Sequence, residues 1–174
     1  MDNSFVAYIQ KLELIGFFAG YPLIYAIVIV IAGSIKDNKR IMARTASLLP
    51  FAYAFVGVLF LGFLLRKLYP DYSIEHIKQT IQKPWLIIWG LLSLLFWIPA
   101  IGKKKALSLV HGLVFFLLPV IDLFMYLFST GADNNIVKND MKVYTSSLIL
   151  NLASLIVLML LSSLFAYLRK HIKV

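Results

Sequence analysis

The sequence is built from long apolar runs separated by short charged or turn-rich connections. Each run has about 18 to 23 residues, the length that an α-helix needs to cross a hydrocarbon core of about 30 Å. Such runs lie approximately at 15–35, 46–65, 84–101, 106–128 and 146–168. We therefore predict an all-α membrane protein, a bundle of five transmembrane helices.

The proportion of charged residues agrees with this prediction. Only 14% of the 174 residues are charged and 61% are hydrophobic, whereas a soluble domain has about 25% charged residues. The longest connection between two apolar runs has about 18 residues, too few for a separate soluble domain. We expect residues 1–174 to form a single integral membrane domain.

The basic residues favour one orientation of the spans. Of the 17 Lys and Arg residues, ten fall in the connections 36–44 and 103–105 and in the tail 169–173. With five spans, these three segments share one side of the membrane, and the remaining seven residues lie on the other. Because cytoplasmic loops carry an excess of Lys and Arg, we predict an outside N-terminus and a cytoplasmic C-terminus for a multi-pass protein of the inner membrane.

The net charge of +9 raises the question of a nucleic-acid partner. Nucleic-acid binding proteins gather their basic residues on one face or along one helix, but here they form short clusters between apolar spans. We expect the lipid bilayer to be the partner of these cations and expect no nucleic acid. The sequence has no cysteine, so disulfides and thiolate metal sites are excluded.

The stretch SIEHIKQTIQKP, before the third run, has the pattern of a short amphipathic helix. Ile74, Ile77 and Ile81 fall on one helical face, while Glu75 and Lys78 fall elsewhere. Helices of this kind lie in the plane of the membrane interface. We predict an interfacial helix before span three.

One carboxylate, Asp122, lies inside an apolar run, about seven residues or 10 Å from its outer end. A charge at membrane depth costs about 2.5 to 3.5 kcal/mol on insertion scales, so a partner is expected. We predict an Arg66–Asp122 pair with Asn151 as hydrogen-bond neighbour, and His111 on the same helical face eleven residues earlier. Such a cluster either fixes helix packing or carries a proton or ion, and both interpretations stay open.

Two further patterns indicate close helix packing. Gly16 and Gly20 form a GxxxG motif in the first run, which lets helices approach closely. The fifth run carries small and polar residues at spacings of three and four, and the expected packing positions there are Ser147, Ser154 and Ser162.

The sequence lacks the motifs of common catalytic and nucleotide-binding sites, including GxSxG, HExxH and the P-loop. His76 and His171 lie outside the runs, so neither paired haem ligands nor a multi-histidine metal site is expected, and we predict no cofactor or metal. The leading hypothesis is a non-enzymatic integral subunit or scaffold of a larger inner-membrane complex for secretion, energy transduction or transport, with other integral membrane subunits as partners. The alternative is a small ion-coupled transporter that uses Asp122.

Overall fold

The computed structural model describes residues 14–34, 39–81, 83–128 and 134–171. Within these ranges every element is helical, and the short 3₁₀-helices are labelled η. In chain order the elements are η1 (Leu14–Phe17), α2 (Tyr21–Ser34), α3 (Lys39–Leu68), α4 (Ile74–Thr80), α5 (Pro84–Leu92), η2 (Ser93–Trp97), α6 (Pro99–Gly102), α7 (Lys105–Phe128) and α8 (Asn134–His171).

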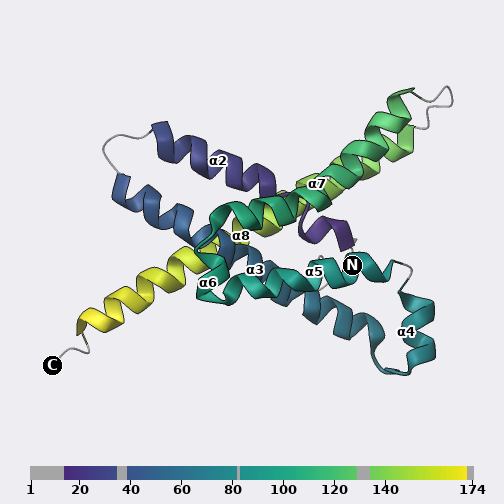
Figure 1. The fold of residues 1–174 in the computed structure, drawn as a ribbon, viewed down its shortest axis with the longest axis horizontal. Coiled ribbons are helices and arrows are strands. Elements are labelled where there is room, and N and C mark those ends of the chain that lie inside the picture. The colour runs from purple at the N-terminus through teal and green to yellow at the C-terminus, as the bar shows by residue number, and fades with distance from the viewer. Residues whose placement is uncertain (1–13, 35–38, 82, 129–133, 172–174) are drawn as a thin grey trace, which may run out of the picture.

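The two longest helices, α3 and α8, cross near the middle of the molecule (Figure 1). The segment α5–η2–α6 runs back along α3, and α7 then runs beside the first part of α8. The end of α2, the start of α3 and the end of α8 lie at one end of the molecule, while α4 and the end of α7 lie at the other. The second half of α8 extends beyond the crossing.

The first apolar run is not one continuous helix. Residues 14–17 form the 3₁₀-helix η1, a turn follows at 18–20, and α2 begins at Tyr21. Pro22 lies in the first turn of α2, where its missing N–H leaves no helical hydrogen bond unmade. The described part of the predicted span 15–35 is therefore helical but broken near its N-terminal end.

The third run is also broken. Ser93 begins η2 and its hydroxyl donates to the carbonyl of Gly90 at 2.6 Å. Ile98 is extended, with φ −71° and ψ 121°, before Pro99 starts α6. The ring of a proline disfavours helical geometry in the residue before it, so Ile98 and Pro99 account for the second interruption.

Among the described residues, three helical stretches are long and apolar enough to cross a membrane: Leu14–Ile31, Ala43–Leu68 and Lys142–Arg169. A fourth candidate arises if Ile74–Thr80 and Pro84–Trp97, which are bent by 94°, count as one span. The helix Lys105–Ile121 is apolar but shorter. These helices indicate a membrane protein, and the five predicted spans stay a prediction.

Aromatic side chains form the core where η1 and α2 meet α3 and α7. Phe18 stacks on Phe115 with ring centroids 4.7 Å apart, and its ring meets Phe60 and Tyr53 edge-on at 5.3 and 5.5 Å. All four side chains are fully buried. Offset and edge-to-face contacts of this kind add to the packing energy beyond area burial, so this cluster fixes the broken first run against its neighbours.

Candidate functional site

His111 lies at the centre of an aromatic group contributed by α3, α5, η2 and α7. Its imidazole stacks on Trp89, with centroids 4.7 Å apart and ring planes 8° apart. Tyr53, Phe96 and Phe115 surround it at centroid distances of 5.5, 5.7 and 6.1 Å. The histidine is only 8% exposed, so its ring nitrogens depend on protein partners.

Both ring nitrogens of His111 have such partners. Nε2 lies 2.9 Å from the carbonyl oxygen of Trp89 and Nδ1 lies 2.7 Å from the hydroxyl of Tyr53. A carbonyl only accepts, so Nε2 carries the proton, and in the neutral ring Nδ1 accepts from the Tyr53 O–H. The indole N–H of Trp89 donates back to the carbonyl of His111 at 3.3 Å. These bonds join α3, α5 and α7 through one side chain.

A second polar contact links α2 to the start of α7. The hydroxyls of Tyr21 and Ser108 are 2.7 Å apart, and Ser108 also donates to the carbonyl of Lys105 at 2.7 Å. Because a serine hydroxyl has one proton, Tyr21 is the donor to Ser108. The Tyr21 ring packs on Tyr53 with centroids 4.2 Å apart, so the two polar contacts share one aromatic group.

The break between η1 and α2 is held by side chains of α8. Gly20 N–H donates to the hydroxyl of Ser147 at 2.7 Å. The amide nitrogen of Asn151 donates to the carbonyls of Phe17 and Ser147, each at 2.9 Å. Non-helical backbone is tolerated at membrane depth only where other groups satisfy it, and here Ser147 and Asn151 supply those groups.

The amide of Asn151 is oriented by these contacts. Its nitrogen faces two carbonyl oxygens, which fixes the oxygen Oδ1 on the opposite side. Oδ1 is buried and has no hydrogen-bond partner among the described residues. Among the described residues it is the one buried side-chain acceptor left open, and it lies next to a helix break.

Of the predicted packing positions, Gly20 and Ser147 contact each other, and the others have different neighbours. Gly16 and Gly20 are both buried, and a Cβ added to Gly20 would lie 2.5 Å from the backbone nitrogen of Leu148. Ser154 is buried and donates to the carbonyl of Leu150 in its own helix at 2.9 Å. Ser162 is contacted by Arg44, which donates to its carbonyl at 2.9 Å and to its hydroxyl at 2.7 Å.

The predicted Arg66–Asp122–Asn151 cluster is described only in part. Arg66 is exposed in the last turn of α3. Asp122 belongs to α7, but its side chain lies outside the described residues, so the pair with Arg66 stays a prediction. Both amide N–H groups of Asn151 are used at the carbonyls of Phe17 and Ser147, and His111 belongs to the separate aromatic group around Tyr53 and Trp89.

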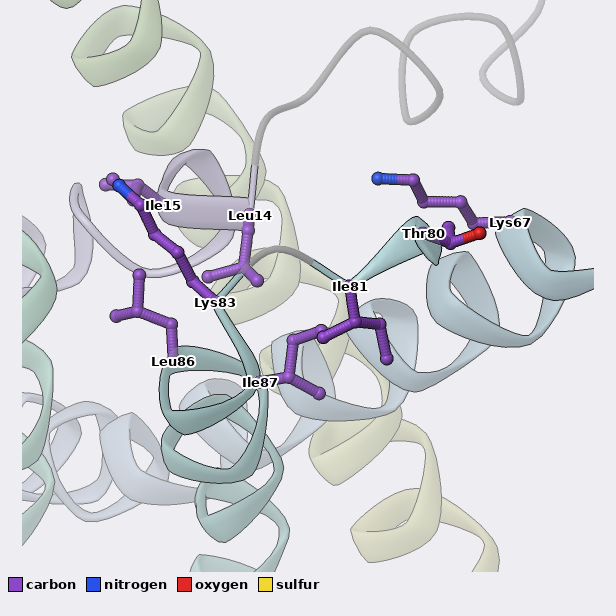
Figure 2. Close-up of a pocket in the computed structure, with 8 residues that line it drawn as sticks. All are labelled: Leu14, Ile15, Lys67, Thr80, Ile81, Lys83, Leu86 and Ile87. Atoms are coloured by element: carbon purple, nitrogen blue, oxygen red, sulfur yellow. The ribbon is translucent and has the colours of Figure 1, made fainter. Parts of the chain in front are cut away.

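A cavity of about 310 Å³ opens beside the last turn of α3. Five of its eight lining residues are apolar, and two lysines and a threonine complete the lining (Figure 2). The eight lining residues come from η1, α3, α4 and α5 and the connection between α4 and α5: Leu14, Ile15, Lys67, Thr80, Ile81, Lys83, Leu86 and Ile87.

Sequence reasoning did not identify Tyr53, Trp89 or the carbonyl of Phe17 as partners of the polar residues. Tyr53 carried a signal, because a tyrosine in the middle of an apolar run needs a partner for its hydroxyl when buried. Nothing in the sequence indicated the Phe17 carbonyl as a partner, since this carbonyl becomes available only where the helix breaks.

The described residues hold no group of three or more His, Cys, Asp or Glu side chains that could bind a metal ion. The arrangement around His111 and Asn151 can therefore join helices and hold one further hydrogen-bond donor at Asn151 Oδ1. Comparisons of the chain with protein-family models, curated proteins and solved structures found no match.

Proposed function

We propose that the chain is a non-enzymatic integral subunit or scaffold of a larger inner-membrane complex. The observation that carries this proposal is the exposure of α8. Only 22% of the span window in Lys142–Arg169 is buried, against 44% for Leu14–Ile31 and 50% for Ala43–Leu68. Its second half carries large apolar side chains that the chain itself leaves uncovered: Ile156, Val157, Leu160, Leu161, Leu164, Phe165, Tyr167 and Leu168.

The buried polar groups also support a packing role. His111, Asn151, Ser147 and Ser154 each bond to neighbouring backbone or side chains. Polar groups that already form these hydrogen bonds are not available to bind a substrate. An apolar helix of another integral membrane protein would cover the exposed half of α8, and an acidic side chain on it would complement Arg44, which is exposed beside this face.

The proposal is tested by photo-crosslinking in membranes. A photoreactive residue at Leu160, which is 66% exposed, is compared with the same residue at Ile88, which is 61% exposed on α5. We expect an adduct with one other membrane protein from position 160 alone. Purification through that protein should then recover the full chain in a fixed stoichiometry. Lipid adducts alone from both positions would contradict the subunit proposal.

The finer proposal for the fold is a five-span bundle with an outside N-terminus, a cytoplasmic C-terminus and α4 in the outer interface. The 94° bend before α5 and the exposed Tyr69, Tyr72 and Trp85 near α4 support an interfacial position. Because the chain has no cysteine, single cysteines report topology directly. We expect Tyr72→Cys to react with an impermeant thiol reagent from outside, and Ser34→Cys and Lys104→Cys only after the membrane is opened.

The broken helices favour one second candidate, an ion-coupled carrier that uses Asp122. Interrupted helices at membrane depth form the ion and substrate sites of many transporters, and Asn151 Oδ1 is an open acceptor beside the break at 18–20. Proteoliposomes with an internal pH dye test proton coupling under an imposed potential. Flux that Asp122→Asn abolishes supports a proton-coupled carrier. Flux no greater than that of empty vesicles excludes one.

A further inference from the structure

The cavity between η1, α3, α4 and α5 combines two kinds of surface. Leu14, Ile81, Leu86 and Ile87 contribute apolar side chains to its lining. In the view of Figure 2, the amino groups of Lys67 and Lys83 lie above these side chains on opposite sides, with that of Lys83 beside Ile15. A volume of about 310 Å³ is at the small end of the range for ligand sites, roughly 300 to 1,000 Å³. It suits part of a ligand, such as a headgroup and the start of a chain.

The charged side chains among the eight described lining residues are of one sign. None of the eight described lining residues is acidic, and Lys67 and Lys83 are both exposed. The hydroxyl of Thr80, which lies 3.4 Å from Nε2 of His76, adds a polar group at the same edge. An anion with an attached apolar chain would complement this surface, because the lysines would face its charge and the walls its hydrocarbon.

Aromatic residues place the cavity at the level of lipid headgroups. Tyr69 lies two residues after Lys67 and is 71% exposed, and Trp85 lies two residues after Lys83 and is 53% exposed. Exposed Tyr and Trp residues at the ends of membrane helices mark the boundary between hydrocarbon and water. The two lysines therefore belong at the depth of lipid phosphates.

We propose that this cavity binds one acidic phospholipid. Lys67 and Lys83 flank the phosphate of its headgroup from opposite sides, Thr80 donates a hydrogen bond to a phosphate oxygen, and the first part of an acyl chain lies against Ile81, Leu86 and Ile87. This cavity is distinct from the exposed half of α8, so the lipid proposal can be tested independently of the subunit proposal.

Native mass spectrometry of the full chain in detergent tests the site. Phosphatidylglycerol and phosphatidylcholine with the same acyl chains are titrated separately. We expect one phosphatidylglycerol to be retained in preference to phosphatidylcholine. The pair Lys67→Gln and Lys83→Gln should weaken this binding about tenfold or more, since each Lys near an anionic surface contributes about 1 kcal/mol. The matched pair Lys103→Gln and Lys104→Gln, which removes the same charge elsewhere, should leave it unchanged.

A second pair of variants keeps both lysines and tests the proposal even if the variant with Lys67→Gln and Lys83→Gln fails to fold. Ile87→Trp fills the apolar part of the cavity and should lower phosphatidylglycerol binding, whereas Ile88→Trp, at the exposed neighbouring position, should not. Equal weakening by both lysine pairs would overturn the proposal, because the attraction would then be diffuse. So would equal competition by inorganic phosphate.

Discussion

Gly20, in the turn at 18–20, and Ser147, in α8, are in direct contact although they are 127 residues apart in sequence. The Gly20 N–H donates to the Ser147 hydroxyl at 2.7 Å, and a Cβ on Gly20 would lie 2.6 Å from the backbone carbon of Ser147. The contact thus requires both the absence of a side chain at 20 and a hydroxyl at 147. It joins the broken first run to α8 at the point where the break needs a hydrogen-bond acceptor.

Gly20→Ala should destabilise the protein by about 1 to 3 kcal/mol, the usual cost of overpacking a rigid site. The added methyl would meet backbone atoms of α8, which cannot rotate away as a side chain can. Reversible unfolding in mixed micelles measures the change. Gly62→Ala is the matched control: nothing lies within 4 Å of that position, so a better helix former there should be neutral or slightly stabilising. Equal losses in both variants would refute the close contact.

Two substitutions of Asn151 separate its donor role from its size. Asn151→Leu removes the hydrogen bond to the buried Phe17 carbonyl and should cost about 1 to 3 kcal/mol. Asn151→Asp should cost more at neutral pH, because a carboxylate has no N–H and sets a negative charge against the carbonyls of Phe17 and Ser147. The same unfolding measurement applies. If the Asp variant is as stable as the wild type, the amide does not face these carbonyls.

Ser163→Ala is the control for these variants. Its hydroxyl donates only to the carbonyl of Met159 in its own exposed helix turn, so its loss should change stability by no more than about 0.5 kcal/mol.

The apolar runs predicted the helical class, because hydrophobic length is a local property of the sequence. They did not predict the break at 18–20. Pro22 gave a signal for it, since proline favours the first turn of a helix, but the surrounding apolar residues allowed the run to be interpreted as continuous. The turn persists because Ser147 and Asn151, far away in sequence, satisfy its backbone.

The sequence did not show which groups contact the buried polar residues. Asn151 and His111 were predicted to lie in one cluster with Asp122, yet depth along a helix cannot tell which neighbour faces them. Asn151 meets backbone that a helix break exposes, and His111 meets Tyr53 through the crossing of α3 and α7. Both outcomes depend on helix rotation and crossing, which hydrophobic periodicity leaves undetermined.

The bond between Tyr53 and His111 can be measured by a double-mutant cycle. His111→Phe leaves the buried Tyr53 hydroxyl without its acceptor, whereas in a Tyr53→Phe background that part of the cost is absent. We expect the double variant to be more stable than the sum of the single losses predicts, by about 0.6 to 1.7 kcal/mol, the range for hydrogen bonds between membrane helices. The same cycle with Ser163→Ala in place of Tyr53→Phe should be additive. Additivity in both cycles would contradict the bond.

The start of α4 depends on Asp71. Its carboxylate accepts from the Ser73 N–H at 2.8 Å and from the Ser73 hydroxyl at 3.0 Å. Ser73 in turn caps the helix by accepting from the His76 N–H at 3.3 Å. The hydrogen bond from the Ser73 backbone, followed by that from its hydroxyl, holds the pKa of Asp71 below its ordinary value.

This lowered pKa predicts how α4 responds to acid. A carboxyl whose pKa is lower in the folded state stabilises the fold fully above its unfolded pKa of about 3.9, and that contribution is lost as the pH falls through the folded pKa. The Ser73 amide resonance, followed by NMR in detergent, should therefore shift with a midpoint below the ordinary Asp value, and the shift should vanish in Asp71→Asn. A midpoint at or above the ordinary value would mean that Ser73 does not hold the carboxylate, and that the cap forms without it.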